Sequence, residues 1–143
     1  METKGGYLIS RIKQLGGRRF DRMLDEAGIE AFNGAQGRIL YVLWQEDGVT
    51  ISQLSSRTSL ANTTLTSMLD RMEQSGLVTR EASPKDRRAL LIRLTDAARA
   101  LQADYERISQ QMNELYYEGF TEDEVRQLEG YLTRILANLE GGK

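Results

Sequence analysis

A change of apolar spacing at Gly76 constrains the fold of this chain more than any other feature. Before it, four apolar residues follow the i, i+3, i+4, i+7 spacing of an amphipathic helix: Leu65, Met68, Leu69 and Met72. After it, residues 77–80 and 89–94 form two aliphatic runs, separated by a polar segment with the only proline, Pro84. The sequence therefore predicts a helix over 62–75, followed by a β-hairpin with an exposed tip.

A second short helix is predicted just before residues 62–75. Residues 50–57 carry Ile51 and Leu54 on one face, and 58–60 leave room only for a tight turn. The order helix, tight turn, helix, hairpin is that of a winged helix-turn-helix. The predicted fold is therefore mainly α with a small β-hairpin wing.

Capping residues mark the helix starts. Three capping boxes are predicted: Asn33 with Gln36, Thr50 with Gln53, and Thr121 with Glu124. Thr95 is the predicted cap of another helix, and Asn62 is chemically a better cap than Ala61 for the helix near them. Together with the apolar spacing, these starts predict helices over 7–27 and 35–46, and two more in the last third.

Apolar residues in the last third repeat at alternating threes and fours, which is the seam of helices that pack lengthwise. Helix 7–27 carries a further apolar stripe. We expect these stripes to meet one another and those of a second chain. The predicted dimer-interface residues are Leu8, Ile12, Leu15, Leu115, Val125, Leu128, Leu132, Ile135 and Leu139. The alternative is that the helices close a monomeric bundle.

Charge is unevenly distributed along the 143 residues. The net charge is −2, but residues 57–95 carry +3 and residues 96–143 carry −5. A basic middle beside an acidic tail is typical of a DNA-facing module attached to one that does not face DNA. We expect an N-terminal dimerisation helix over 1–32, a DNA-binding lobe over 33–95 and C-terminal dimerisation helices over 96–143.

Two residue types are missing, and each absence excludes a class of chemistry. Without cysteine there is no disulfide and no thiol redox sensor, and the lack of histidine argues against a zinc site or a histidine base. No glycine-rich phosphate loop is present, so we expect no enzyme, cofactor or metal. No apolar run approaches the ~20 residues of a membrane span, and the N-terminal residues lack a signal-peptide pattern. A cytoplasmic protein is expected.

Helix 62–75 presents short polar side chains opposite its apolar stripe: Thr63, Thr64, Thr66, Ser67 and Arg71. Short side chains let a helix sit close to base edges in a major groove ~12 Å wide. Asp70 would repel DNA, so we expect it to turn sideways toward a neighbouring arginine. The alternative is an ordinary solvated helix face.

The predicted hairpin tip carries four charged residues in a row: Lys85, Asp86, Arg87 and Arg88. An arginine projected from such a wing can enter the narrow minor groove, where the negative potential is enhanced. We expect the Asp86 carboxylate to hold a guanidinium two residues away in a charge-assisted pair. Taken alone, the same tip would be a solubilising loop, but the preceding helix-turn-helix favours the DNA-binding interpretation.

Three stretches resemble the MarR-family pattern: Asp70 to Arg80, Ser83 to Ala89, and Leu94-Thr95. That pattern has a recognition helix ending in a D-R-L-E-K-K-G-L-V-x-R run, a wing with P-x-D-R-R, and L-T at the start of the next long helix. The resemblance extends over nearly the whole chain, and the wing and the helix end are its specific parts. It implies an obligate homodimer on a near-palindromic operator, with each recognition helix in a major groove and each wing in the adjacent minor groove.

The resemblance assigns DNA contacts by position. In the recognition helix they are Asn62, Thr63, Thr64, Thr66, Ser67 and Arg71; in the wing they are Lys85, Asp86, Arg87 and Arg88. Arg57, at the end of the preceding helix, is a phosphate contact. The implied function is sequence-specific regulation of transcription, as a repressor released by a small-molecule ligand. The main alternative is a winged-helix module that binds protein and not DNA.

The missing residue types also narrow the effector. Peroxide-sensing members of the family use a reactive cysteine, and zinc-sensing members use histidines with acidic residues. What remains is a small organic effector, or none, bound between the dimerisation helices and the DNA-binding lobe. The residues expected to line such a site are Tyr7, Arg11, Phe20, Arg38, Tyr41, Trp44, Met112 and Tyr116. The alternative is that the aromatic residues belong to the core.

Overall fold

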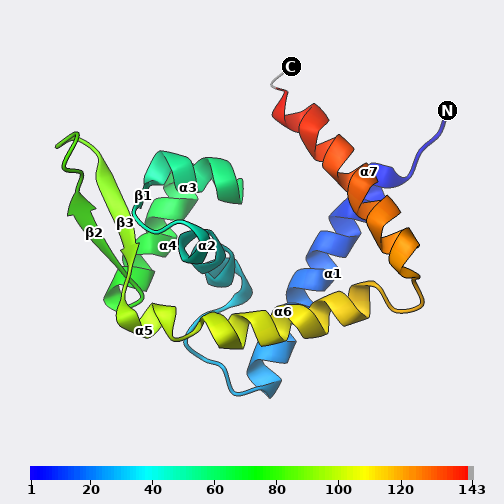
Figure 1. Ribbon diagram of the computed structural model, residues 1–143, viewed down its shortest axis with the longest axis horizontal. Helices are drawn as coiled ribbons and strands as arrows, with labels where there is room; N and C mark the ends of the chain where they lie inside the picture. Colours follow the sequence, from blue (N-terminus) through cyan, green and yellow to red (C-terminus); the bar gives the residue numbers. More distant parts are fainter. Residues whose placement is uncertain (142–143) are drawn as a thin grey trace. The chain divides into compact units, whose positions relative to one another are not determined.

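Residues 1–141, which the computed structural model describes, are mostly helical (Figure 1). The elements are α1 (Gly5–Glu26), α2 (Gly34–Gln45), β1 (Val49–Thr50), α3 (Ile51–Thr58), α4 (Asn62–Gln74), β2 (Val78–Ala82), β3 (Leu90–Leu94), α5 (Asp96–Arg99), α6 (Gln102–Tyr116) and α7 (Glu122–Glu140). The chain forms two compact units, one spanning 1–109 and one beginning at Gln110. The predicted fold class, mainly α with a small hairpin wing, is confirmed.

All three predicted capping boxes form. At the start of α2, Asn33 Oδ1 accepts a hydrogen bond from the Gln36 amide at 2.8 Å, and Gln36 Oε1 accepts from the Asn33 amide at 3.1 Å. The same reciprocal pair begins α3 and α7. Thr95 caps α5 through its hydroxyl oxygen, as predicted. Of the two candidate caps of α4, Ala61 and Asn62, the N-cap is Ala61 and not the chemically better Asn62, so no side chain caps this helix.

The sheet has three antiparallel strands in the order β1-β3-β2. The hairpin pairs Val78 with Leu94 at its base and Ala82 with Leu90 near its tip, close to the predicted runs. Strand β1 was not predicted, because two residues are too short to show alternation and Thr50 is read as a helix cap. It pairs through Val49 opposite Ile92.

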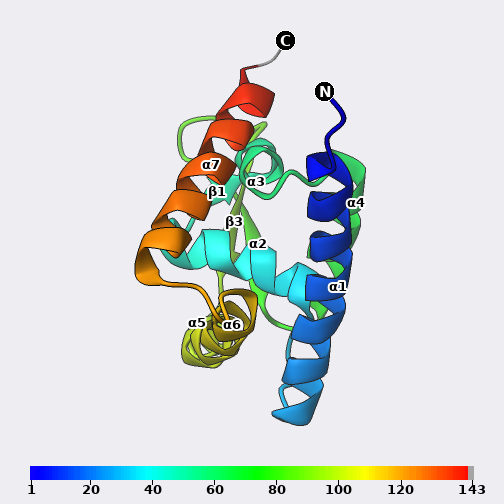
Figure 2. The same cartoon turned by 90° about the vertical axis from the view of Figure 1, so that its right-hand side faces the viewer.

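The core of the first unit is built from the predicted stripes. Leu65, Leu69 and Met72 of α4 are completely buried, so the helical spacing correctly identified the inward face of this helix. They join apolar residues from the other elements of the unit: Leu24, Ile39, Leu40, Leu43, Leu54, Val78, Ile92 and Ile108. Helix α2 crosses α1 (Figure 2), and Asp21 of α1 accepts a hydrogen bond from the Gly34 amide at 2.8 Å.

The last third differs from the prediction in one respect. A short helix, α5, ends at Arg99, and α6 begins only at Gln102, so the helix predicted to begin at Thr95 is divided. Later in the chain, the Tyr117 hydroxyl donates to Glu129 Oε2 at 2.6 Å and joins the end of α6 to α7. Within residues 1–141, no helix has the length and apolar character needed to cross a bilayer.

Candidate nucleic-acid interface

The turn between α3 and α4 is held by side chains. Ser59 adopts a left-handed conformation at φ 60°, which ends α3 and redirects the chain. The buried Thr58 hydroxyl donates to the Leu54 carbonyl at 2.6 Å and accepts from the Leu60 amide at 3.3 Å. The Ser55 hydroxyl donates to the Leu60 carbonyl at 2.6 Å. These bonds fix the direction in which α4 leaves α3.

Helix α4 presents its polar residues to solvent. All six predicted recognition-helix contacts are exposed: Asn62, Thr63, Thr64, Thr66, Ser67 and Arg71. The opposite face is buried against the core. The helix therefore cannot rotate about its axis without exposing its leucines, and its polar face stays in solvent. Because no side chain caps α4, the amide groups of its first turn remain available to an anion at this end of the helix.

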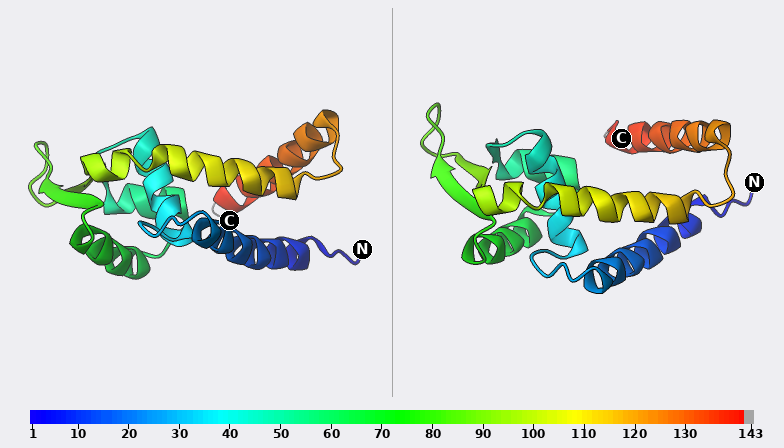
Figure 3. Two further views of the ribbon diagram at one scale, coloured as in Figure 1. Left: turned by 90° about the horizontal axis from the view of Figure 1, so that it is seen from below. Right: turned by 60° about the horizontal axis from the view of Figure 1, so that its bottom comes forward.

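The wing extends from the helices of the first unit (Figure 3). Its tip is closed by hydrogen bonds from the Ser83 amide to the Ala89 carbonyl at 3.0 Å and from the Ala89 amide to the Asp86 carbonyl at 3.1 Å. All four charged tip residues, from Lys85 to Arg88, are exposed.

Asp86 was predicted to hold a guanidinium, and this prediction was wrong. Its Oδ1 accepts a hydrogen bond from the backbone amide of Arg88 at 3.0 Å, and no ion pair of Asp86 is found within residues 1–141. A short aspartate side chain reaches the amide two residues on more easily than a guanidinium, which is the geometry of an Asx turn. Asp86 therefore shapes the turn and leaves the Arg87 and Arg88 side chains free of this carboxylate.

Two of the arginines near α4 form ion pairs. Arg80 Nη2 lies 2.8 Å from Asp70 Oδ1, so the prediction that Asp70 turns toward an arginine is confirmed. Arg57 Nη1 lies 2.6 Å from Glu46 Oε2, with both side chains largely exposed. An exposed pair of this kind is weak, so phosphate can compete with Glu46 for Arg57.

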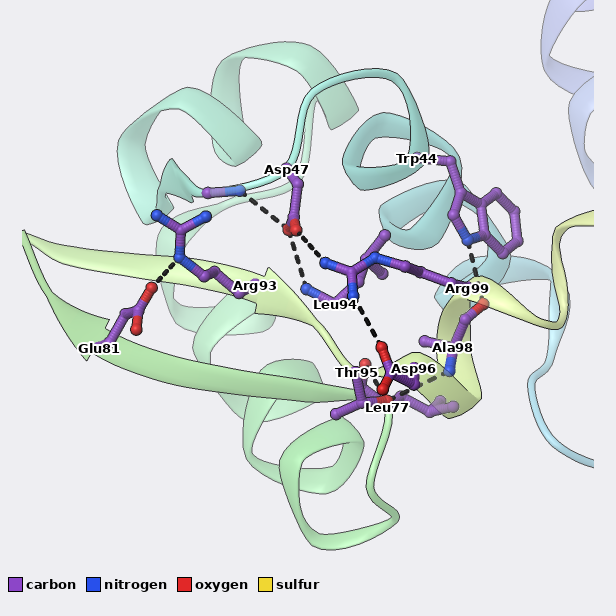
Figure 4. A network of polar contacts seen from close by, with 11 residues as sticks. Trp44, Asp47, Leu77, Glu81, Arg93, Leu94, Thr95, Asp96, Ala98 and Arg99 are labelled. Atoms are coloured by element: carbon purple, nitrogen blue, oxygen red, sulfur yellow. Dashed lines mark hydrogen bonds and ion pairs between the residues drawn. The ribbon is translucent and has the colours of Figure 1, made fainter.

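A network around Asp47 attaches α5 to the base of the wing (Figure 4). Asp47 Oδ1 accepts from the amides of Gly48 and Leu94, both at 2.9 Å, and its Oδ2 lies 2.8 Å from Arg99 Nη2. The hydrogen bond from Asp47 raises the pKa of Arg99 above its ordinary value. Nearby, the Trp44 indole donates to the Ala98 carbonyl at 3.1 Å. This network was not predicted, because Asp47 lies about fifty residues before Leu94 and Arg99 in the sequence.

Three of the residues predicted to line an effector site surround Tyr105 of α6. The ring centroids of Phe20, Tyr41 and Trp44 lie 5.7, 5.9 and 5.3 Å from that of Tyr105. Burial raises the pKa of the Tyr105 hydroxyl. A Cβ atom at Gly37 would lie only 2.8 Å from the Tyr105 ring, so this glycine lets the ring approach α2. Tyr105 was not among the predicted site residues.

The other predicted effector-site residues are not part of this ring cluster, although the charge of Arg38 acts to lower the pKa of Tyr105. Tyr7 and Arg11 are exposed on α1, where the Arg11 guanidinium donates to the Tyr7 hydroxyl at 3.3 Å, and Arg38 is exposed on α2. Met112 is buried and Tyr116 exposed, both in the second unit. A cavity of about 410 Å³ lies between the end of α1 and the start of α2, lined by Asp21, Leu24, Asp25, Ile29, Glu30, Phe32, Asn33 and Gln36.

The predicted interface residues are largely exposed in the single chain. On α1, Leu8, Ile12 and Leu15 are each about half exposed. On α7, Leu139 is 76% exposed and Leu132 is 41% exposed. Val125 and Leu128 are half-buried, and Leu115 and Ile135 are exposed.

Sequence comparison relates the part of the chain that holds α2, α3, α4 and the wing to a known family. The model of the MarR family matches residues 32–90, which include α2, α3, α4 and the wing. The match covers less than half of the chain, so the similarity to the MarR family is shown for this lobe. The organic hydroperoxide resistance transcriptional regulator of Bacillus subtilis is 44% identical over 57 residues, 40% of this chain and 39% of that protein. The matched segment thus spans well under two thirds of that relative.

Two further proteins are similar over nearly the whole chain. The transcriptional repressor IacR of Pseudomonas putida is 28% identical over 137 residues, which are 94% of this chain and 78% of the repressor. A crystal structure of a mutant MarR from E. coli, complexed with operator DNA, aligns with a TM-score of 0.77 and 26% identity. That alignment covers 93% of this chain and 96% of the other. The winged-helix architecture is therefore shared with MarR regulators beyond the matched lobe.

Proposed function

We propose that this chain belongs to the MarR family and is a sequence-specific regulator of transcription that binds double-stranded DNA as a repressor. The observation that carries the proposal is that the exposed hydroxyl face of α4 and the basic wing tip belong to one compact unit. Short hydroxyl side chains suit a helix in the major groove, and arginines suit the adjacent narrow minor groove. The E. coli relative crystallised with operator DNA supports the same use of this fold.

In this proposal the recognition helix contributes Asn62, Thr63, Thr64, Thr66, Ser67 and Arg71. The wing contributes Lys85, Arg87 and Arg88, and Asp86 holds the shape of its turn through the Arg88 amide. Arg57 contacts phosphate after exchanging Glu46 for it. Residues 33–95 act as the DNA-binding lobe.

The chain acts as a homodimer joined by its terminal helices. The support is the row of exposed apolar residues on α1 and α7, since side chains of this kind are stabilised when a second surface covers them. A two-fold dimer presents two recognition helices, which read half-sites one helical turn apart, roughly 34–36 Å. The operator is therefore near-palindromic.

A small organic ligand is the effector in this proposal. A ligand that favours a different separation of the two recognition helices weakens DNA binding by its differential affinity, about 1–3 kcal/mol for ordinary allosteric coupling. The candidate contacts are the aromatic residues around Tyr105, namely Phe20, Tyr41 and Trp44, together with Arg38, whose charge acts on the Tyr105 hydroxyl.

Selection of bound sequences from a random pool of duplex DNA tests the proposal. The expected result is a near-palindromic site whose affinity falls steeply as salt is added, because phosphate contacts release counterions. Binding that does not depend on salt, or no enrichment of any sequence, would contradict the proposal and favour a protein-binding module.

The wing is tested by replacing Arg88 with alanine. Arg88→Ala should weaken binding to the selected site by roughly 1–3 kcal/mol, since a groove contact is lost, while the dimer remains intact. Arg134→Ala on α7 is the matched control, which removes the same charge outside the lobe and should bind normally. Unchanged affinity of the Arg88 variant in an anisotropy titration would remove the wing from the interface.

A further inference from the structure

Arg80 is a charged residue on the inward face of an edge strand. Strand β2 lies at one edge of the sheet, and Arg80 is two residues after the buried Val78, so both side chains lie on the same face. Its cross-strand neighbour, Ile92, is completely buried, and the Arg80 side chain is only 20% exposed. The guanidinium is therefore directed toward α4 and not toward solvent.

This guanidinium bridges one turn of α4. Its Nη2 atom lies 2.8 Å from Asp70 Oδ1 and donates to the Thr66 carbonyl oxygen at 3.4 Å. Residues four apart lie one above the other on a helix, so both acceptors face β2 together. One strand residue thus contacts the backbone of Thr66, whose side chain belongs to the proposed DNA-binding face.

The arrangement is a poor way to gain stability. Arg80 Nε is buried and lacks a hydrogen-bond partner among the described residues. An unpaired buried donor costs free energy, and an ion pair whose carboxylate is 55% exposed contributes little to stability. An inward charge also discourages pairing of the sheet edge with another chain, but that role does not require Asp70.

Asp70 is the one acidic residue between Asn62 and Met72, and it lies on the helix that approaches DNA. Without a cationic partner, its carboxylate would repel the phosphates on either side of the groove. With Arg80 beside it, the pair is neutral and the turn between Thr66 and Asp70 is fixed relative to the strand that leads to the wing.

We propose that Arg80 is a positioning residue for DNA recognition that acts through Asp70 and touches no DNA itself. It neutralises the carboxylate and sets the recognition helix against the wing strand. This inference rests on the proposed DNA-binding function and adds a residue that contributes to affinity from inside the lobe.

A double-mutant cycle tests the inference. Wild type, Arg80→Ala, Asp70→Asn and the double variant are titrated against a fluorescent duplex of the selected site and against an unrelated duplex. Arg80→Ala should weaken binding to the selected site about tenfold in the wild-type background. In the Asp70→Asn background the same substitution should weaken it less than about threefold, because no unpaired carboxylate is left.

Two further variants keep the test decisive. Arg80→Lys retains a cation for Asp70, so it should bind within about threefold of wild type and should fold if the alanine variant does not. Arg107→Ala is the control, since Arg107 forms an exposed pair with Asp104 at 3.5 Å on α6 and should leave affinity unchanged. Thermal unfolding of each variant is recorded, because a purely structural role would lower stability equally in both backgrounds.

The outcomes separate the two claims. If wild type binds the selected duplex but Arg80→Ala weakens binding equally with and without Asp70, or not at all, this inference is overturned and the proposed function stands. If wild type binds no duplex at low ionic strength, the proposed function fails and the inference fails with it.

Discussion

The lobe proposed to bind DNA and helix α7 carry apolar stripes of the same helical spacing, but only the stripe of the lobe is buried within one chain. Leu65 and Leu69 of α4 are completely covered within one chain. None of the residues Glu122–Glu140 that form α7 is buried, and Leu139 is 76% exposed. The first unit therefore buries this stripe within one chain, whereas no residue of α7 is buried.

Amphipathic spacing therefore identifies the apolar face of a helix, but it does not identify the surface that covers this face. In the lobe, α3 and the wing supply the cover for α4. For α7 we propose that another copy of the chain supplies it. The predictions below test this contrast, beginning with the largest expected effect.

Leu132→Arg should abolish the dimer. It places a charge in the proposed apolar seam, where desolvation without a partner is costly. Sedimentation velocity at micromolar concentration should show a monomer, and circular dichroism should show normal helix content. The control is Ala137→Arg, which adds the same charge on the far side of α7 and should remain dimeric. A monodisperse dimer of the Leu132 variant would place the seam elsewhere.

Leu69→Ala should destabilise the lobe by about 2–5 kcal/mol, because it removes a fully buried side chain and leaves a cavity. Urea unfolding followed by circular dichroism measures this loss. The loss should be the same at all protein concentrations, whereas the effect of Leu132→Ala should depend on concentration. A Leu69 variant as stable as wild type would show that the stripe is not the core of the lobe.

Asp47→Asn should cost about 1–2 kcal/mol, because the charged acceptor shared by the Gly48 and Leu94 amides and Arg99 is lost. The control is Asp104→Asn, whose exposed pair with Arg107 should matter by less than about 0.5 kcal/mol. Equal unfolding midpoints for the two variants would show that the Asp47 network does not hold α5 to the wing.

The smallest effect is a pH dependence at Tyr117. Its hydrogen bond to Glu129 raises the pKa of Tyr117 to about 12 from the ordinary 10.0. Because the folded state holds the proton more tightly, the stabilisation is fully present below pH 10 and is lost as the pH rises toward 12. Thermal unfolding of wild type and Tyr117→Phe should therefore converge over this range. Parallel curves would contradict the assignment.

Local signals predicted much of the fold. The capping boxes at Asn33, Thr50 and Thr121 need only residues three apart, and all three formed as predicted. The inward face of α4 followed from spacing alone, and the partner type of Asp70 followed from its charge. The family resemblance supplied the fold of the whole chain.

Features that depend on distant residues could not be predicted. Strand β1 exists because Val49 pairs with Ile92, more than forty residues later in the sequence. The Asp47 network likewise joins residues that are far apart in the sequence. Asp86 accepts a hydrogen bond from a backbone amide, although an ion pair with a guanidinium was expected. Which of the two forms depends on the conformation of the turn. Asn62 has the better capping side chain, but the helix begins one residue earlier than that cap requires, so Ala61 is the N-cap.

The central claim is that two lobes of a paired molecule hold one duplex. Sedimentation equilibrium of the protein with the selected duplex, at low ionic strength, measures the mass of the complex directly. The account predicts two chains for each duplex, with dissociation as salt is raised. A complex containing a single chain, or free protein beside free DNA, would contradict it.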